Sequence, residues 1–383
     1  MRLSPHWFIL AAASLGVIAS GCAGSTVAPS GAANSALQAA GARAGLAAPA
    51  DTTSILKLLK KSVVIGSTVD PGNGDKGPYA LSVVPCNHCG ALTKGQLVVC
   101  NFDNSSGTAG DGTTIEVLDS KEGSSPKRFI ENEAIEGCDG DALTSINEVY
   151  GGGLTGGDVV EFSNRGKAAK SYSGQPVANP FSDADALPKA PFSPEYIFVG
   201  TTTGGLVSIS AGFYGNGLAT QVVEGFEVNK GTGWSALAPS GLQYSRGLDT
   251  LYVVDGVTNT VVALSHASEL LEQNEIVVES GGKTFKCEHP KVTCGSLVYG
   301  GTPLDAPVAA TLLPNGNLIV ANTQGTANTL VELTPQGQVL DTKVVDTSKT
   351  QGVYGLAASG TSDSNTVLFF TDTNSNEVIE LEQ

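Results

Sequence analysis

Short apolar segments of one type recur along the chain. Each has five residues, with apolar residues first and fourth and a small or acidic polar residue last. The six segments are Ile115–Asp119, Val159–Ser163, Leu206–Ser210, Val261–Ser265, Leu330–Thr334 and Val378–Glu382. Their first residues lie 44, 47, 55, 69 and 48 positions apart, and blades of a β-propeller repeat about every 40–50 residues. The spacing predicts six repeat units, with loop insertions in the two longer intervals.

Further β-rich segments stand just before most of these motifs. Middle strands are expected at Leu97–Asn101, Tyr196–Gly200, Leu251–Asp255, Leu318–Asn322 and Leu368–Asp372, and a preceding strand at Ser240–Tyr244, Ala306–Ala310 and Val353–Ala357. Turn-forming residues follow these runs, as antiparallel hairpins require. In the second unit, residues 146–157 give no clean middle strand.

The order of these segments resembles a known repeat. A small-Gly-Leu segment, then Leu251-Tyr-Val-Val-Asp255, then Val261-Val-Ala-Leu264 is similar to the NHL-type repeat of six-bladed β-propellers. The resemblance covers residues 77–383 and implies an all-β ring of four-stranded blades, which bury their faces by radial packing. The chain stops just after the third-strand motif of the last unit, so we expect Ser62–Val69 to supply the missing strand and close the ring. Two separate domains, or a β-sandwich with incidental repeats, are the alternatives.

Two stretches depart from the strand pattern. Thr53–Lys61 carries four apolar residues and three lysines, and is interpreted as a packed lead-in to the closing strand, with a short amphipathic helix as the alternative. Ser265–Asn274 carries two leucines and three glutamates within the longest interval, and predicts a helical insertion. Insertions on one face of a propeller often bind partners.

The N-terminal residues indicate export. Residues 1–21 have a basic start and a short apolar run that ends in small residues, which is typical of a cleaved signal peptide. Ala19–Cys22 resembles the bacterial lipobox, which implies that Cys22 is lipidated; an ordinary signal with a chance cysteine is the alternative. Ala23 follows the cysteine where aspartate would favour inner-membrane retention, so the resemblance points to the outer membrane.

Residues 22–50 then form a small-residue, almost uncharged tether before the propeller domain, residues 51–383. As a flexible coil the tether would span about 30 Å. We therefore expect an exported, lipid-anchored protein, disordered in its tether, with the propeller in the periplasm or at the cell surface.

Composition narrows the partners. The formal net charge of −16 repels phosphate backbones, which makes nucleic-acid binding improbable. The membrane, reached through the N-terminal lipid, and a protein or glycan are the expected partners of a monomeric chain.

Six cysteines remain after Cys22, an even number that suits disulfides in an oxidising compartment. They are Cys86, Cys89, Cys100, Cys138, Cys287 and Cys294. Cys287 and Cys294 are expected to pair, and the other four to pair among themselves. Cys86-Asn87-His88-Cys89 also allows a redox or metal-binding reading.

Two classes of function stay open. Six-bladed propellers of the lactonase and gluconolactonase type hold a divalent cation in the central channel, and carboxylate and amide side chains that would suit Ca²⁺ stand at the ends of the middle strands. These candidates are Asn101, Asp103, Asp255, Asn322 and Asp372. Such residues also bond turn amides, and no hydrolase or nucleotide motif, catalytic residue or cofactor is identified. The sequence therefore favours a non-catalytic binding or scaffolding lipoprotein, with a calcium-type hydrolase or lactonase as the alternative.

Overall fold

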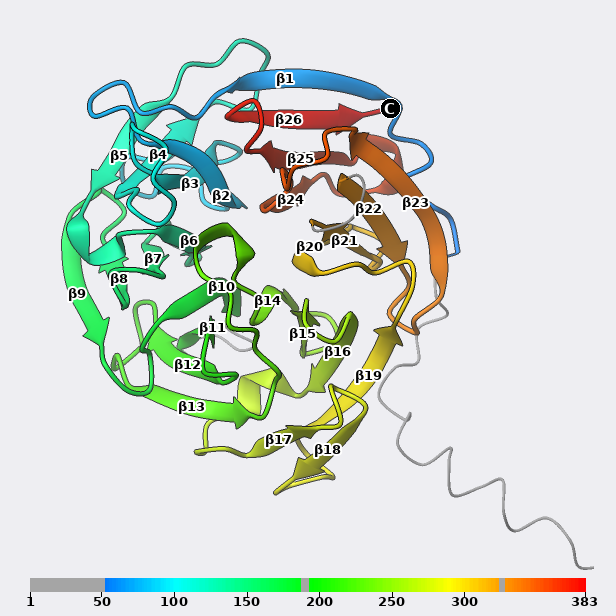
Figure 1. Ribbon diagram of the computed structural model, residues 1–383. Coiled ribbons are helices and arrows are strands. Elements are labelled where there is room, and N and C mark those ends of the chain that lie inside the picture. The colour runs from blue at the N-terminus through cyan, green and yellow to red at the C-terminus, as the bar shows by residue number, and fades with distance from the viewer. Residues whose placement is uncertain (1–51, 187–192, 324–327) are drawn as a thin grey trace, which may run out of the picture. The chain divides into compact units, whose positions relative to one another are not determined.

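The structure, a computed structural model, describes residues 52–186, 193–323 and 328–383. The predicted signal peptide, Cys22 and the tether fall outside these residues. In the described parts, strands form six sheets around a central axis (Figure 1). The few helices in these ranges are 3₁₀ turns of three residues, and none of the described helices could cross a membrane.

Each sheet is one blade, and its strands are numbered outward from the axis. Blade 1 contains β2 (Lys76–Val83), β3 (Leu97–Asp103), β4 (Thr114–Leu118) and β5 (Lys127–Glu131). Blade 2 contains β6 (Cys138–Leu143), β7 (Val149–Gly153), β8 (Asp158–Phe162) and β9 (Ala168–Ser173). Blade 3 contains β10 (Pro180–Ala186), β11 (Glu195–Thr201), β12 (Leu206–Ala211) and β13 (Ala219–Glu224).

The second half of the ring repeats this order. Blade 4 contains β14 (Pro239–Ser245), β15 (Thr250–Asp255), β16 (Thr260–Ser265) and β19 (Cys294–Gly300). Blade 5 contains β20 (Pro307–Leu312), β21 (Leu318–Asn322), β22 (Asn328–Leu333) and β23 (Val339–Asp346). Blade 6 contains β24 (Leu356–Ser359), β25 (Val367–Asp372), β26 (Glu377–Glu382) and, as its outermost strand, β1 (Lys61–Ser67).

The ring closes as predicted. Strand β1 pairs antiparallel with β26, from Lys61 opposite Glu382 to Ser67 opposite Glu377. The first and last strands of the described chain are therefore neighbours, as the top of Figure 1 shows. The six-blade count and the four-stranded blades are confirmed, and the two-domain and sandwich alternatives are excluded.

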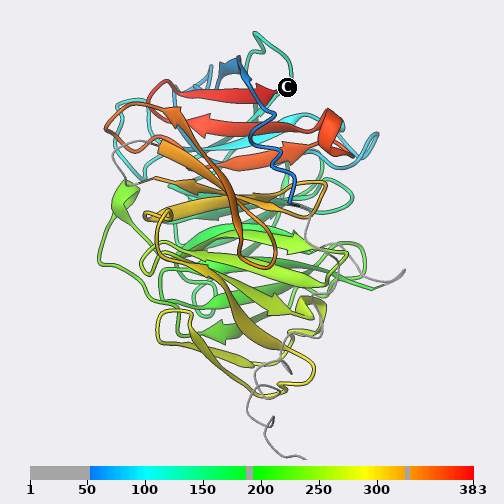
Figure 2. The same cartoon turned by 90° about the vertical axis from the view of Figure 1, so that its right-hand side faces the viewer.

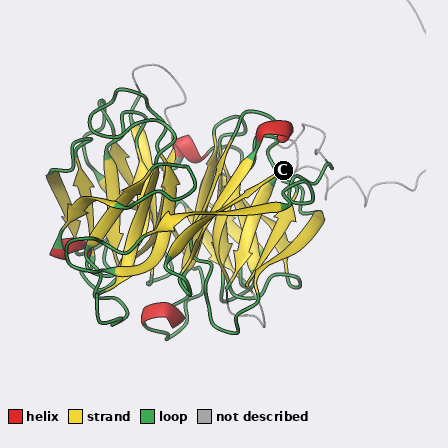
Figure 3. Ribbon diagram, turned by 90° about the horizontal axis from the view of Figure 1, so that it is seen from above, coloured by secondary structure: helices red, strands yellow, loops and turns green. Residues whose placement is uncertain are grey.

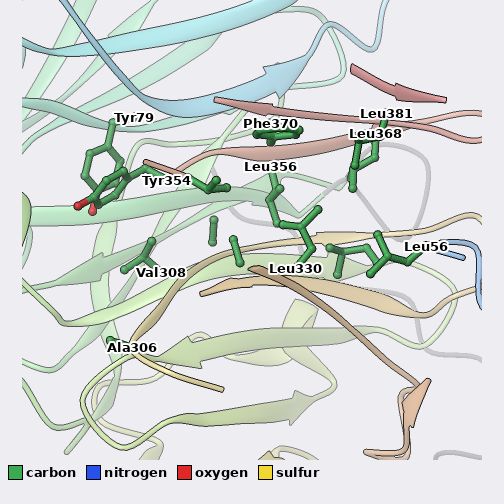
Figure 4. Packing of buried hydrophobic residues seen from close by; sticks show 14 of the residues in the cluster. Leu56, Tyr79, Ala306, Val308, Leu330, Tyr354, Leu356, Leu368, Phe370 and Leu381 are labelled. Carbon is green, nitrogen blue, oxygen red and sulfur yellow. The ribbon is translucent and has the colours of Figure 1, made fainter. Parts of the chain in front are cut away.

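The lead-in to β1 is a packed turn, as favoured from the sequence. Ile55, Leu56 and Leu59 are fully buried in the core cluster that also holds residues of blades 5 and 6, and Figure 4 shows Leu56 beside Leu330. The Glu332 carboxylate fixes this turn, because it accepts hydrogen bonds from Ser54 Oγ at 2.7 Å and from the backbone N–H of Leu56 at 2.9 Å.

Two local expectations are wrong. Ser265–Asn274 is not a helical insertion: it holds only the 3₁₀ turn η3 (Ala267–Glu269), and the longest interval instead contains a hairpin of β17 (Ile276–Glu279) and β18 (Thr284–Cys287). The hairpin extends the sheet of blade 3, where β17 pairs parallel to β13. In the segment read as a helix, Leu270 is buried and Leu271 is exposed, so the two leucines do not form one apolar helical face.

The second unit does have a middle strand, β7. It escaped notice because it ends in three glycines, which carry no apolar signal. The glycines are needed for close packing: a Cβ at Gly153 would lie 2.5 Å from the backbone carbonyl carbon of Ile135. Contact with η1 (Glu133–Ile135) therefore replaces side-chain packing here.

The two faces of the ring carry different connections. Because the strands of a blade are antiparallel, the loops from first to second and from third to fourth strand share one face. The lead-in lies on that face, at the end of β22 and beside the β20–β21 loop, where Asn317 bonds Glu332; we call it the N-terminal face. The other connections, including those between blades, lie on the opposite face. Figures 2 and 3 show the strands between these two layers of loops.

The structure pairs the six cysteines as three disulfides, Cys86–Cys89, Cys100–Cys138 and Cys287–Cys294. The Cys287–Cys294 pair and the grouping of the other four agree with the sequence expectation. Cys100–Cys138 joins β3 to β6 and so links blades 1 and 2 beside the axis.

Adjacent residues of β1 test the closing strand. Ile65 is 1% exposed and Val64 is 45% exposed, so their truncation should differ. Ile65→Ala should lower the free energy of unfolding by about 2–5 kcal/mol, because it leaves a cavity in the core. Val64→Ala should cost less than about 1 kcal/mol. Urea unfolding of both variants measures the difference, and equal losses would contradict the packing of this strand.

Candidate functional site

The central channel is narrow and closed by aromatic rings. The first strands of the six blades line a cavity of about 60 Å³. Four aromatic side chains meet at its opposite-face end, Tyr79 from β2, Phe102 from β3, Trp234 from η2 (Gly233–Ser235) and Tyr354 from the turn before β24; we call them the aromatic cluster. Tyr79 stacks on Trp234 with ring centres 5.5 Å apart, and Tyr354 lies 4.5 Å from Trp234 and 4.6 Å from Tyr79.

Glycine makes room for the indole. Gly77 has a φ of +72°, and a Cβ there would lie 2.9 Å from Trp234 Cζ2 and 3.0 Å from Asp103 Cγ. Both groups therefore approach the β2 backbone more closely than any other residue would allow. This contact fixes Trp234 across the channel.

A larger hollow of about 530 Å³ lies at this end of the channel, on the opposite face. We call it the mouth site. It is lined by Asp103, Trp234, Lys349, Thr350, Gln351, Thr373 and Asn374. These residues come from blade 1, from the connection into blade 4, and from two loops of blade 6, so only the closed ring brings them together.

Asp103 is the residue of the mouth site with unused hydrogen-bonding capacity. Its Oδ2 accepts a hydrogen bond from Trp234 Nε1 at 3.3 Å, whereas its Oδ1 is buried and has no hydrogen-bond partner among the described residues. Burial raises the pKa of Asp103, and the indole N–H opposes that shift. A ligand group that donates a hydrogen bond to Oδ1 would remove the desolvation cost of this oxygen.

Hydrogen bonds hold the loop that carries Thr350 and Gln351. Asn374 Nδ2 donates to Asp346 Oδ2 at 2.8 Å, and Thr350 Oγ1 donates to Asn374 Oδ1 at 2.6 Å. The Tyr354 hydroxyl lies 2.7 Å from Gln351 Oε1. This wall of the mouth site is therefore preorganised, which lowers the entropy cost of binding.

Two carboxylates line the channel below the aromatic cluster. Asp139 and Asp141 lie two residues apart on β6, directly after the disulfide-bonded Cys138, and both are buried. Asp141 Oδ1 accepts a hydrogen bond from Ser82 Oγ at 3.1 Å, and its Oδ2 has no hydrogen-bond partner among the described residues. Burial raises the pKa of Asp141 to about 7. A second cavity of about 250 Å³, which Asp141 also lines, opens from here to the N-terminal face.

Of the five residues predicted to bind a cation, only Asp103 lines the mouth site. Asn101 Nδ2 donates to Thr68 O at 2.9 Å. Asp255 and Asp372 accept turn amides of Val257 and Asn374 at 2.9 Å each, and Asn322 accepts the amide of Asp305 at 3.0 Å. These four residues hold separate turns on four blades, so the five do not fit a single calcium site.

The described residues contain two groups of histidine and carboxylate atoms close enough to share an ion. They are Asp249 with His266 and Glu269, and Glu272 with Glu288 and His289. None of the five predicted ligands belongs to either group. Both lie around the insertion between β16 and β19, away from the channel.

Sequence reasoning missed Trp234, Asp139 and Asp141. The signal for the carboxylates was present, because Cys138-Asp139-Gly140-Asp141 alternates as a strand does and puts both acids on one side. It was lost because the second unit could not be aligned to the repeat. Trp234 stands in a Gly- and Ser-rich connection whose place over the channel depends on the whole ring.

The structure is similar to several solved structures. A gluconolactonase from Xanthomonas campestris superposes with a TM-score of 0.52 at 11% identity, covering 84% of this chain and 97% of that one. The virginiamycin B lyase from Staphylococcus aureus gives 0.50 at 13%, covering 84% and 99%. A chain of a nidogen/laminin complex gives 0.51 at 13%, covering 74% and 85%.

The chain is a six-bladed β-propeller. At these identities the likeness shows the fold alone, and the fold hosts unrelated functions. No protein-family model and no curated protein matches the sequence. The function of this propeller has to be argued from its own residues.

The raised pKa of Asp141 predicts a pH-dependent stability. Between about pH 4 and pH 7 this carboxyl is ionised in the unfolded chain but protonated in the folded one, so the folded state loses stability as pH rises through this window. Asp141→Asn removes the loss. The variant should be more stable than the parent by up to about 4 kcal/mol at alkaline pH, and equal to it below about pH 4.

Urea unfolding across this pH range measures the effect. Asp305→Asn, at an exposed carboxylate, is the matched control and should leave the pH dependence unchanged. An Asp141→Asn variant with the parent's pH dependence would show that Asp141 titrates normally.

Proposed function

We propose that this protein is an exported, lipid-tethered binding module with NHL-type blades, which captures a small polyhydroxylated ligand, such as a glycan, at the mouth site. The proposal combines the predicted lipidation of Cys22 with the chemistry of the opposite face. The observation that carries it is the buried, unpaired Oδ1 of Asp103 beside Trp234, at the wall of a hollow of about 530 Å³.

The lining suits a sugar. The half-buried indole of Trp234 offers an apolar surface with a polar edge, which is typical of aromatic side chains at binding sites. Asp103 offers a hydrogen-bond acceptor, and Thr350, Gln351, Thr373 and Asn374 offer hydroxyl and amide groups around it. A few convergent polar groups around an apolar surface fix the orientation of a small ligand.

Binding can be followed through Trp234 itself. The chain has two tryptophans, and the other, Trp7, lies in the predicted signal peptide, so the mature protein has a single fluorescent indole. We expect a member of a panel of neutral oligosaccharides to change its emission on titration. Asp103→Ala should weaken that affinity about 10–100-fold, because a charge-assisted hydrogen bond contributes about 1.5–3 kcal/mol.

Asp305→Ala is the control for that titration, because Asp305 is an exposed carboxylate on the same face that does not line the mouth site. It should bind as the parent does. Equal affinities for the two variants, or a panel without effect on the emission, would contradict the proposal.

A second candidate function is hydrolysis in the channel. The observation that favours it is the pair Asp139 and Asp141, since a carboxyl with a pKa near 7 suits general acid–base chemistry and carboxylate oxygens are the ligands that Ca²⁺ takes. Metal analysis of the purified protein, with a screen of lactone and phosphoester substrates, separates the two functions. A calcium-dependent turnover abolished by Asp141→Asn but not by Asp103→Ala would favour the hydrolase.

A further inference from the structure

The loop between β12 and β13 presents large apolar side chains to water. Phe213 is 81% exposed, Leu218 63% and Tyr214 48%, and Leu271, just after η3, is 49% exposed. We call these four residues the apolar rim. From Ala211 to Thr220 the sequence has no charged residue, which is unusual on the surface of so acidic a chain. Large exposed apolar groups mark interaction surfaces.

The loop is held in this exposed form by its backbone. Gly217 N donates to Ser210 O at 2.9 Å, and Ser210 N donates to Leu218 O at 2.9 Å. Lys170 Nζ also donates to Gly217 O at 2.8 Å. Phe213 packs edge to face on Tyr214, with ring centres 5.0 Å apart. The aromatic rings therefore contact each other while Phe213 stays in water.

Leu218 and Leu271 belong to one surface. Both line a hollow of about 200 Å³, together with Tyr196, Ser208 and Thr220. The loop from β12 and the segment after β16 thus form one rim across blades 3 and 4. It offers apolar side chains at the edge and hydroxyl groups behind them, an order that matches the border between acyl chains and headgroups of a bilayer.

The position of the rim indicates which partner covers it. Both of its segments are connections from a third strand toward the outer edge, so they lie on the N-terminal face, the face of the lead-in Ser54–Leu59. The tether, residues 22–50, leads to that turn and would span about 30 Å. The mouth site lies on the opposite face.

We propose that the apolar rim inserts into a lipid surface and holds the propeller with its N-terminal face toward the membrane. The inference rests on the proposed lipid tether, because one acyl-type anchor gives only marginal binding and a second contact makes it stable. The rim carries no charge, so insertion is driven by the burial of apolar area. The mouth site then faces the aqueous phase, where a soluble glycan can reach it.

The test uses the mature chain, residues 22–383, with Cys22→Ser, so that no acyl chain contributes. This chain should float with phosphatidylcholine vesicles, and equally well at low and at high salt, because apolar insertion is not screened. The double variant Phe213→Ser/Leu218→Ser should lower the partition coefficient about 100-fold, or about tenfold for each side chain.

Val344→Ser is the matched control. Val344 is 53% exposed on β23, the outermost strand of blade 5, and its replacement should leave flotation unchanged. Melting temperatures and the Trp234 titration, which does not depend on the rim, show that each variant is folded. A parent chain that stays with the soluble fraction would overturn the proposal and favour a protein partner. Loss of flotation at high salt, or an equal effect of Val344→Ser, would also overturn it.

Discussion

The pairing of β1 with β26 is the contact on which the rest of the structure depends. Each blade can bury its faces only between two neighbours, so an open ring would expose the flanks of blades 1 and 6. The closing strand brings its own anchor, the buried turn that Glu332 fixes through Ser54 and Leu56. The mouth site is a direct consequence, because its walls come from blade 1 and blade 6 on the two sides of this closure.

The channel shows how the closed ring is used. Trp234 and its neighbours fill one end with aromatic rings, while Asp141 stays buried with one unpaired oxygen. Asp103 and Asp141 both cost folding free energy, since a buried polar atom without a partner is not compensated. Residues that lower stability in this way are typical of functional sites. Their separation by the aromatic cluster favours two different roles, ligand recognition at the mouth and acid–base or cation chemistry in the channel.

Sequence patterns predicted the architecture because propeller blades repeat the same apolar order. The third-strand motifs, the closing segment at Ser62–Val69 and the disulfide Cys287–Cys294 were all legible locally. The site was less so. Asp255 and Asp372 looked like cation ligands because a turn cap and a ligand have the same residue type, and only the hydrogen bonds of the folded chain distinguish them.

Residues whose role depends on distant packing left weak signals. Trp234 lies over the channel because Gly77 admits its ring, a contact across more than 150 positions of sequence. The glycines of β7 gave no apolar pattern, although their packing against η1 requires them. Ser265–Asn274 has the composition of a helix, but Leu270 is drawn into the core while Leu271 is left on the apolar rim.

The account assigns the two faces different partners, lipid on the N-terminal face and a soluble ligand on the other. Quenching by brominated phosphatidylcholine measures this arrangement directly. In the vesicle-bound chain with Cys22→Ser, the emission of Trp234 should be unquenched. A Phe213→Trp variant that also carries Trp234→Phe should be strongly quenched, because position 213 would lie among the brominated acyl chains. Strong quenching of Trp234, or none at position 213, would contradict the account.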